Sequence, residues 1–448
     1  MTAPLTNSAI VAGYVQSARV QTLQPEILDA AKMCFVDWLA VCIGARSTPE
    51  AQALRRYVAH NAQAGNVALL TGGMADAATA ALINGTLSHC LDYDDTHIPT
   101  ALHASGPTLA VVLALGSSLD AGEEDLLRAF VCGFEVGASF GSGRLGVRLN
   151  ERGWHSTAVL GRLGAAAACA CLLQLDAEQT EDALGLAATQ AGGLTASFGT
   201  MAKPFHAGKA AADGLMAARL AQAGLAASHN LFDSGKGLFG SIFQDRETLP
   251  DLSGLGRKPE ILANSFKPYA ACQLAHAPID AALRLREQIG DAALRAISVE
   301  VNPLAIEIAG LRNARTPTEG RFSTGYCMAL ALKGHPLTPS SFSTALLEDP
   351  ELAELASRVS MVANPEVERT AANVEAVLDD GRTLQVSVPH AFGSSGNPMG
   401  WPQIESKFMS LVQPELAADA ATLFSTLESF EQPGSLRRTL SLVDRIGA

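Results

Sequence analysis

The sequence predicts a mainly helical protein with an α+β segment inserted before its last fifty or so residues. Of its 448 residues, 48% are hydrophobic but only 5% are aromatic, and Ala and Leu favour helices whereas strands are enriched in β-branched and aromatic residues. After about residue 254 short alternating segments typical of strands appear. We therefore expect a large all-helical domain from residues 1–256 and 394–448, and a smaller α+β domain from residues 257–393.

The predicted helices rest on apolar residues spaced near the helical period and on residues that begin or end helices. Pro25 suits a first helical turn and Gly44 suits a helix end. The same reasoning predicts helices over residues 25–43, 75–89, 107–119, 123–140, 157–175, 177–191, 207–223, 403–412 and 414–430. The short loops between most of them are typical of a compact helical bundle.

Four segments of the inserted part are predicted as strands. Residues 296–301 alternate with period two, and residues 359–362 are a second candidate. Residues 374–378 and 383–388 flank an Asp-Asp-Gly-Arg turn, and Asp-Gly between alternating segments favours a β-hairpin. Helical patterns over residues 275–289 and 323–331 lie among these strands, which indicates an α+β module.

Composition argues against several classes of protein. The net charge of −13, without a basic stripe, argues against nucleic-acid binding. The apolar runs are too short or too interrupted to cross a bilayer, which needs about 20 residues, and residues 1–7 lack the features of a signal peptide. The eight cysteines form no CxxC pair and lie mostly in Ala- or Val-rich sequence, which predicts buried, reduced thiols in a cytoplasmic protein.

The segment from Ser88 to His97 is the densest group of ionisable residues, with His103 six residues further on. Three hypotheses fit this spacing. The first is an acid/base site in which one Asp orients a neighbouring His and Thr96 binds substrate. The second is a divalent metal site, although the spacing matches no named zinc or calcium pattern; its ligands would be His89, Asp92, Asp94 and His97. The third is a solvated loop that caps the next helix.

Three further segments carry candidate site residues. His155 precedes an apolar helix whose cap would be Ser156 or Thr157, and the positive helix end would favour its neutral form. Lys203 precedes a proline, which predicts an extended conformation at an element boundary. Lys267 also precedes a proline, with His276 nearby. A surface-loop histidine and solvated lysines fit these patterns too. A GxGxxG match at residues 141–146 follows a helical pattern instead of a strand, so we reject dinucleotide binding.

Taken together, these residues resemble the MmgE/PrpD family. The resemblance spans most of the chain, through the residues 37–44, 89–103, 155–164, 203–208, 267–276, 322–326 and 396–408. It implies a helical domain made from both chain ends, a smaller α+β lid domain, an active site between them, a homodimer, and neither a metal nor an organic cofactor. Known activities of the family include 2-methylcitrate dehydration, cis-aconitate decarboxylation and iminodisuccinate epimerisation.

The resemblance also implies site residues and their roles. The family's functional positions would fall on Asp92, Thr96, His103, His155, Lys203, Lys267 and Tyr326, and we add His276 as a further substrate-binding residue. His103, oriented by Asp92, would move a proton, and Lys203 and Lys267 would bind substrate carboxylates with help from Thr96 and His155. Tyr326 would donate a proton. Asp94, Asp95 and His97 would serve in loop structure and capping.

The expected function is that of a cofactor-independent lyase acting on a small di- or tricarboxylate. Fixed cationic donors in a dry site would stabilise the enolate that forms next to a carboxylate. We expect a dehydratase-like elimination, with epimerisation or decarboxylation on the same site as alternatives. A metal-dependent hydrolase and a non-enzymatic, dimeric ligand-binding protein are remoter alternatives.

Overall fold

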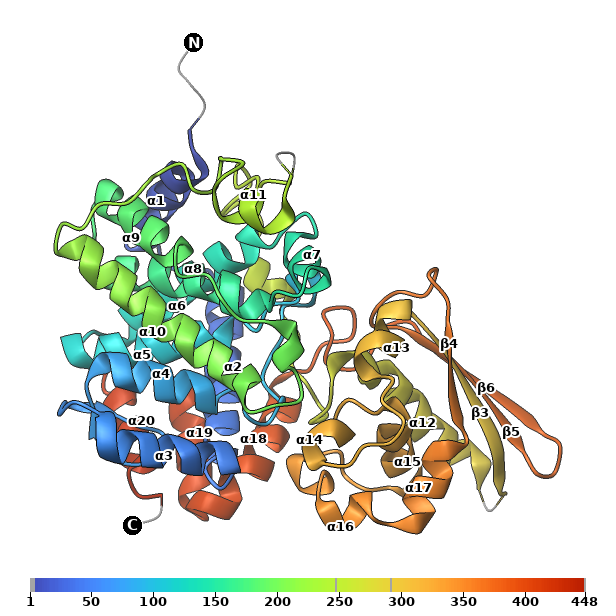
Figure 1. Cartoon of the computed structure of the whole chain (residues 1–448). Helices are drawn as coiled ribbons and strands as arrows, with labels where there is room; N and C mark the ends of the chain where they lie inside the picture. The colour runs from blue at the N-terminus through green and yellow to red at the C-terminus, as the bar shows by residue number, and fades with distance from the viewer. Residues whose placement is uncertain (1–4, 246–247, 291, 447–448) are drawn as a thin grey trace. The chain divides into compact units, whose positions relative to one another are not determined.

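The computed structural model describes residues 5–245, 248–290 and 292–446. The chain divides into two compact units (Figure 1). Unit 1 consists of Met1–Cys90, Asp94–Asn264 and Trp401–Ala448, and unit 2 of Leu91–Tyr93 and Ser265–Gly400. Apart from Leu91–Tyr93, the chain enters unit 2 at residue 265 and returns to unit 1 at residue 401. A mainly helical fold with a small mixed sheet in the inserted part is the predicted class, and it is confirmed.

Unit 1 is a bundle of α-helices with one short hairpin. Its helices are α1 Asn7–Ala18, α2 Pro25–Gly44, α3 Pro49–Asn61, α4 Ala77–Leu87, α5 Ser105–Leu119, α6 Glu123–Phe140, α7 Leu145–Glu151, α8 Ser156–Leu172, α9 Ala177–Ala188, α10 Ala202–Gln222, α11 Leu238–Phe243, α18 Trp401–Leu416, α19 Asp419–Glu428 and α20 Ser435–Val443. The hairpin pairs β1 Val67–Ala68 with β2 Met74–Ala75, and 3-10 turns η1 Ile98–Thr100, η2 Thr195–Ser197 and η3 Glu260–Ala263 lie in its loops.

Two helix boundaries in unit 1 differ from the prediction for identifiable reasons. The predicted break before Pro414 is wrong, because α18 continues through Pro414 to Leu416 and ends where Ala417 adopts a left-handed φ of 48°. The predicted extended Lys203 is also wrong. It lies in the first turn of α10, directly before Pro204. A proline is tolerated in a first turn because the N–H that it lacks has no intrahelical acceptor there.

Unit 2 contains a four-stranded sheet in the order β4-β3-β5-β6. The strands are β3 Leu294–Val301, β4 Val359–Ala363, β5 Ala372–Leu378 and β6 Thr383–Val388. β3 pairs in parallel with β4 and antiparallel with β5. The predicted hairpin joins β5 to β6, and Gly381 takes the positive φ of 85° that its turn requires. Alternate residues of β5 are buried, so one face of the sheet is covered.

Helices of unit 2 cover that face of the sheet. α12 packs against β5 and β6, and α15 packs against α12 (Figure 1). The helices are α12 His276–Ile289, α13 Pro303–Ala309, α14 Pro317–Gly320, α15 Thr324–Lys333, α16 Thr344–Leu347 and α17 Pro350–Ser357, with 3-10 turns η4 Gln273–Ala275 and η5 Pro339–Ser341. The unit is therefore the α+β module that the alternating segments predict.

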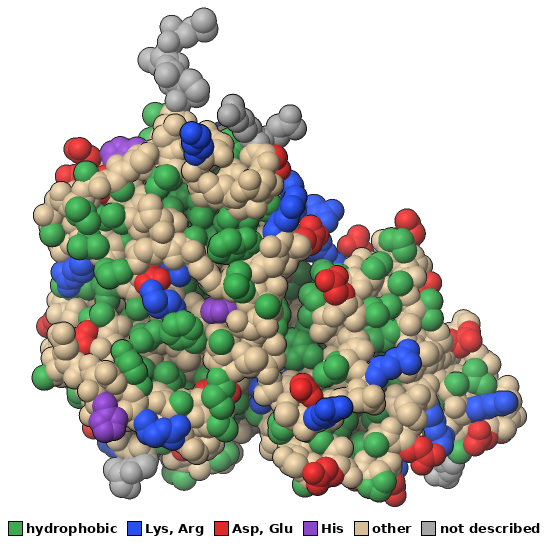
Figure 2. All heavy atoms as spheres, in the orientation of Figure 1, with side chains coloured by type: hydrophobic (Ala, Val, Ile, Leu, Met, Phe, Trp, Pro, Cys, Tyr) green, Lys and Arg blue, Asp and Glu red, His purple; other side chains and the backbone are tan. Residues whose placement is uncertain are grey.

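Surface and core features agree with the composition. On the face shown in Figure 2, Lys and Arg side chains are dispersed, many of them beside acidic ones, and form no continuous basic band. All eight cysteines are buried as free thiols. Among the described residues, no helix combines the length and the apolar character that crossing a membrane requires.

Candidate functional site

Two glycines bring the elements of the unit 1 site together. Gly85 of α4 and Gly208 of α10 meet where these helices cross, and a Cβ built on Gly85 would lie 2.8 Å from the Gly208 Cα. A Cβ on Gly208 would clash with the Leu82 carbonyl. The helices can therefore approach this closely only because both positions are glycine. His89 follows the end of α4. Lys203 and His206 lie at the start of α10, in the turns that precede Gly208.

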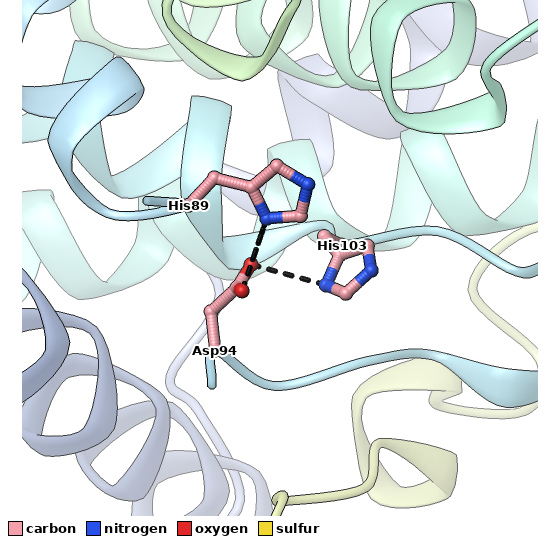
Figure 3. Close-up of side chains that lie close together, drawn as sticks. All are labelled: His89, Asp94 and His103. Carbon is pink, nitrogen blue, oxygen red and sulfur yellow. Dashed lines mark hydrogen bonds and ion pairs between the residues drawn. The ribbon is translucent and has the colours of Figure 1, made fainter. Parts of the chain in front are cut away.

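Asp94 is the centre of the site in unit 1. Its carboxylate contacts Nδ1 of His89 at 2.8 Å and Nδ1 of His103 at 3.0 Å (Figure 3). The side chains of His89 and Asp94 are 0% and 1% exposed, whereas 11% of the His103 side chain remains exposed. His103 is therefore the member of this group that a substrate could reach.

The acceptors around His103 fix its tautomer. Its Nδ1 faces the Asp94 carboxylate, and it also lies 2.9 Å from the Asp95 carbonyl oxygen and 3.3 Å from Oγ1 of Thr96. A carbonyl and an ionised carboxylate can only accept, so Nδ1 of His103 must carry hydrogen. Its Nε2 is then the atom left to accept or deliver a proton. Such a pairing is typical of a histidine that acts as a general acid or base.

The electrostatics of the group favour an ionised Asp94 beside a neutral His89. Burial alone would raise the pKa of the Asp94 carboxyl, but His89 and His103 together hold this pKa well below its usual range. Burial lowers the pKa of His89 to about 4, and Asp94 only partly offsets that effect. His89 is therefore neutral at pH 7. Its Nε2 has no hydrogen-bond partner among the residues that the structure describes.

A second pair of imidazoles lies beside this group. Nδ1 of His155, at the N-cap of α8, is 3.0 Å from Nδ1 of His206, and the His155 ring stacks near His89 with ring centroids 5.9 Å apart. Neither Ser156 nor Thr157 caps α8; Thr157 accepts a hydrogen bond from the His103 backbone N–H instead. Burial is the first cause that holds the pKa of His155 well below its usual range, followed by His89 and Lys203.

Lys203 supplies the positive charge of this region. It is 8% exposed, and its Nζ lies 5.4 Å from the centroid of the Phe198 ring. The pKa values of His89, His155 and His206 are lowered first by burial, and the charge of Lys203 lowers each of them further. Unit 1 thus combines a buried ammonium group with four imidazoles and a carboxylate.

A buried polar network holds the loop that carries Asp94. Oδ2 of the neighbouring Asp95 accepts hydrogen bonds from Ser105 and Asn264, both at 2.5 Å. The Asp95 backbone N–H donates to Asp37, whose carboxylate pairs with Lys407 at 2.5 Å. His97 contacts Thr100 through Nδ1 at 2.7 Å. Asp95 and His97 are thus buried parts of the loop and are not solvated. Asp94, for which the same role was expected, instead contacts His89 and His103.

The expected site residues of unit 2 have different surroundings. Nζ of Lys267 donates to the backbone oxygen of Asp92 at 2.9 Å and to its carboxylate at 3.1 Å. Asp92 adopts a left-handed φ of 50°, which Asp tolerates better than most residues. The prediction that Asp92 orients His103 is therefore corrected, because the carboxylate on the His103 ring belongs to Asp94.

Tyr326 and His276 both lie within unit 2. The hydroxyl of Tyr326 donates to the Ser341 carbonyl over 3.4 Å, and burial, followed by Cys327 and Asp349, raises its pKa to about 12. His276 is fully buried at the start of α12 and donates through Nε2 to the Ala271 carbonyl at 3.1 Å. It thereby holds the turn before its own helix.

The eight expected residues thus fall into two groups. Thr96, His103, His155 and Lys203 lie together in unit 1, and Asp92, Lys267, His276 and Tyr326 lie in unit 2. Apart from the metal hypothesis, in which His89 and Asp94 would be ligands, the sequence reasoning assigned no catalytic role to Asp94, His89 or His206. His206 is one helical turn after Lys203, so helical spacing would have revealed it if Lys203 had been assigned to the helix.

The group could also hold a metal ion. One ligand atom each from His89, Asp94 and His103 lies within 4.8 Å of the others, and three protein ligands are usual for a catalytic zinc. The predicted metal set of His89, Asp92, Asp94 and His97 is not assembled, because Asp92 pairs with Lys267 and His97 with Thr100.

Comparison with known proteins assigns the chain to a family. The MmgE/PrpD N-terminal domain matches residues 9–250, and the MmgE/PrpD C-terminal domain matches residues 269–430. The chain belongs to the MmgE/PrpD family. The N-terminal family domain corresponds to unit 1 without its C-terminal helices. The C-terminal family domain corresponds to unit 2 and extends into those C-terminal helices of unit 1, as far as residue 430. The family resemblance seen in the sequence is therefore confirmed.

Several MmgE/PrpD relatives are cis-aconitate decarboxylases. The mouse enzyme is 27% identical over 96% of this chain and 92% of its own length. The Aspergillus terreus enzyme is 27% identical over 89% of this chain and 87% of its own length. The human enzyme is 29% identical over 76% of this chain and 73% of its own length. These relatives are lyases that act on a small tricarboxylate.

Proposed function

We propose that this protein is a cofactor-independent lyase that acts next to a carboxylate of a small di- or tricarboxylate, with decarboxylation as its first candidate reaction. The observation that carries the proposal is the Asp94 carboxylate on Nδ1 of His103, which leaves Nε2 of an accessible ring for the substrate. The decarboxylase relatives support this reaction over the elimination that the sequence favours. The homodimer stays a prediction.

Decarboxylation needs an electron sink and a proton donor. When the bond to the leaving carboxylate breaks, its electron pair stays on carbon and delocalises toward a neighbouring carboxylate, while carbon dioxide departs. Lys203 would stabilise the added negative charge, because fixed charges in a site from which water is largely excluded act strongly. The imidazolium form of His103 would deliver the proton from Nε2 to the carbon, and water would restore that proton. Asp94 would stabilise the imidazolium.

The neutral form of the same ring supports the alternatives. Nε2 of His103 could remove a proton next to a carboxylate, after which loss of a β-hydroxide gives a dehydratase and protonation of the other face gives an epimerase. We therefore keep elimination and epimerisation as alternatives on the same residues.

An NMR assay separates these reactions. The purified protein would be incubated in deuterated water with a panel of aconitate-, citrate- and aminosuccinate-like acids. A decarboxylase releases carbon dioxide and places one deuterium on the product, a dehydratase forms an alkene, and an epimerase exchanges a proton without net loss. Inactivity toward every acid of the panel, with a folded protein, would contradict the proposal.

The ligand geometry of His89, Asp94 and His103 favours one second candidate, a metal-dependent hydrolase. A bound metal would activate water in place of the proton transfer by His103. Elemental analysis of the purified protein and assays before and after chelation test this candidate. Stoichiometric metal whose removal abolishes activity would favour it over the metal-free lyase.

A further inference from the structure

A buried ion pair lies behind the loop that carries Asp94. Nζ of Lys407, on α18, is 2.5 Å from Oδ1 of Asp37, on α2. Their side chains are 3% and 0% exposed, so both charges are withdrawn from water. Withdrawing charges from water is costly, and a buried ion pair adds little net stability in return. Stability alone therefore does not explain the pair.

Asp37 uses its other carboxylate oxygen to hold the backbone next to Asp94. Oδ2 of Asp37 accepts a hydrogen bond from the Asp95 backbone N–H at 3.1 Å. That N–H belongs to the peptide unit between Asp94 and Asp95, whose atoms lie in one plane from one Cα to the next. The hydrogen bond therefore fixes the plane that contains Cα of Asp94. The carbonyl oxygen of Asp95, in the next peptide unit, lies 2.9 Å from Nδ1 of His103.

The same helix also holds the segment that follows His103. Nε1 of Trp38, the neighbour of Asp37 on α2, donates to the Gly106 carbonyl at 3.3 Å. Gly106 lies in the first turn of α5, shortly after His103 in the chain. α2 is thus bonded to the backbone just after each member of the Asp94–His103 pair.

α18 restricts the position of α2 in turn. The two helices pack against each other (Figure 1), and a Cβ built on Gly44 of α2 would lie 2.7 Å from Cδ2 of Leu411. So close a contact leaves little room for α2 to shift. Lys407 lies one turn before Leu411 on α18, so its ammonium group is held by a packed helix.

Lys407 also provides the counter-charge of the acidic loop. Burial lowers the pKa of Lys407, and Asp37, followed by Asp94 and Asp95, acts against that effect. Burial raises the pKa of Asp37, and Lys407 is the largest influence in the opposite direction. A carboxylate buried without this cation would tend to take up a proton and would lose the charge that strengthens its hydrogen bond to the Asp95 N–H.

We propose that Lys407 and Asp37 are positioning residues for the proton transfer by His103. The ion pair keeps the Asp94 carboxylate on Nδ1 of His103, and it makes the C-terminal helix α18 part of the site. Positioning of this kind acts on turnover and not on substrate binding, because neither side chain of the pair is exposed to a substrate. Its effect on turnover rests on the proposed function, whereas its effect on the Asp94–His103 contact does not.

Replacing both members of the pair tests this role without leaving a buried charge. Asp37→Leu/Lys407→Met removes the acceptor of the Asp95 N–H, and apolar residues of similar volume often replace a buried ion pair without loss of folding. On an acid of the NMR panel, kcat should fall at least about tenfold with KM close to that of wild type, since small misplacements of reacting groups are this costly. Asp37→Asn/Lys407→Met keeps an acceptor and should show a smaller loss of kcat.

Proton NMR of protein labelled with 15N at histidine measures the positioning without any substrate. The hydrogen on Nδ1 of His103, which a carboxylate accepts, should give a downfield signal that is absent in His103→Ala. In Asp37→Leu/Lys407→Met this signal should shift upfield or disappear through exchange with water, and in Asp37→Asn/Lys407→Met it should shift less. The signal of the His155–His206 hydrogen bond, which depends on α8 and α10, should stay.

Arg46→Met is the matched control for the loss of a buried cation. Arg46 is buried just after the end of α2, and its guanidinium donates to the carbonyl oxygens of Leu70 and Ile446 at 2.5 and 2.9 Å. The variant should lower the Tm, because it leaves these two carbonyls without a donor. It should keep kcat and the His103 signal, because Arg46 does not hold the loop that carries Asp94.

Two results would overturn the role of the ion pair. One is a folded Asp37→Leu/Lys407→Met protein whose kcat and His103 signal equal those of wild type. The other is an equal loss of kcat in Arg46→Met, which would reflect general destabilisation. If Asp37→Leu/Lys407→Met does not fold, Asp37→Asn/Lys407→Met decides, and an unchanged kcat and His103 signal there would overturn the role as well.

Failure of the proposed function would look different. A wild-type protein that is inactive toward every acid of the panel would contradict the lyase. A His103 signal that depends on the ion pair would support the positioning even then, because this signal is measured without substrate.

Discussion

Nδ1 of His103 lies 3.0 Å from the carboxylate of Asp94, which also contacts His89. One buried carboxylate thus serves two imidazoles, of which only His103 keeps part of its side chain exposed. The acceptors around Nδ1 leave Nε2 of His103 as the atom for proton transfer.

Replacing Asp94 by Asn should reduce turnover at least about 100-fold, the lower end for general acid–base groups. The amide keeps the shape but removes the charge that stabilises the His103 imidazolium. Steady-state kinetics on an acid of the NMR panel that is consumed measure the loss. The matched control is Asp95→Asn in the same loop, which should keep most of the activity. Equal activity of Asp94→Asn and wild type would remove Asp94 from the site.

Replacing His103 by Ala should also reduce turnover at least about 100-fold, because no other exposed ring takes its place beside Asp94. The fold should be retained, since His103 keeps part of its surface exposed. Circular dichroism checks the fold and steady-state kinetics the loss. A His103→Ala protein with near-normal turnover would contradict the proton-transfer role.

Replacing Lys203 by Ala should lower turnover by a similar factor and raise the pKa values of His89 and His155. Its charge contributes to the lowered pKa of both rings, so its removal relieves part of that effect. NMR titration of histidine-labelled protein measures the shift. Lys209→Ala is the control, because Lys209 lies on the same helix and pairs with Asp213, which Arg162 also contacts. Unchanged histidine titrations in Lys203→Ala would argue against the expected proximity.

Replacing His206 by Ala should destabilise the protein by roughly 1–3 kcal/mol, because it leaves Nδ1 of the buried His155 without its partner. His206→Asn should recover part of the loss, since an amide can still donate or accept. Urea unfolding gives the free energies. If His206→Ala instead lost as much turnover as Lys203→Ala without losing stability, direct contact of His206 with substrate would be indicated.

Asp95 should make stability depend on pH in the direction opposite to most carboxylates. Burial, together with the nearby Asp37, raises its pKa to about 7. The folded protein then holds a proton that the unfolded chain releases near pH 4, so the free energy of unfolding falls as the pH rises from about 4 to 7. Asp95→Asn should lack this fall and be more stable above pH 7 by up to a few kcal/mol.

The comparison with Asp95→Asn isolates this residue, because His89 and Asp94 titrate in both proteins. The amide oxygen can accept both hydrogen bonds that Oδ2 receives, from Ser105 and Asn264. Oδ1 has no partner among the described residues and is the place for the proton or for the amide nitrogen. If the free energies of unfolding of the wild type and of Asp95→Asn changed in parallel from pH 4 to 8, Asp95 would not hold a proton in the folded protein, which would contradict the prediction.

The local pattern of the sequence determined much of the fold. Helical spacing predicted α2 and α6 to within a residue, and Asp-Gly between alternating segments predicted the β5–β6 hairpin. These features depend on neighbours in the chain, so periodicity and turn chemistry reveal them. The family resemblance also named His103, His155 and Lys203, which the fold brings together in unit 1.

Only the tertiary structure decided which aspartate contacts which histidine or lysine. Asp92, Asp94 and Asp95 lie within four residues, yet one pairs with Lys267, one bridges His89 and His103, and one is held by Ser105 and Asn264. The direction of each side chain in this loop depends on the left-handed turn at Asp92 and on partners up to 175 residues away. The sequence determined that acid/base chemistry is concentrated here, and long-range packing decided which groups carry it.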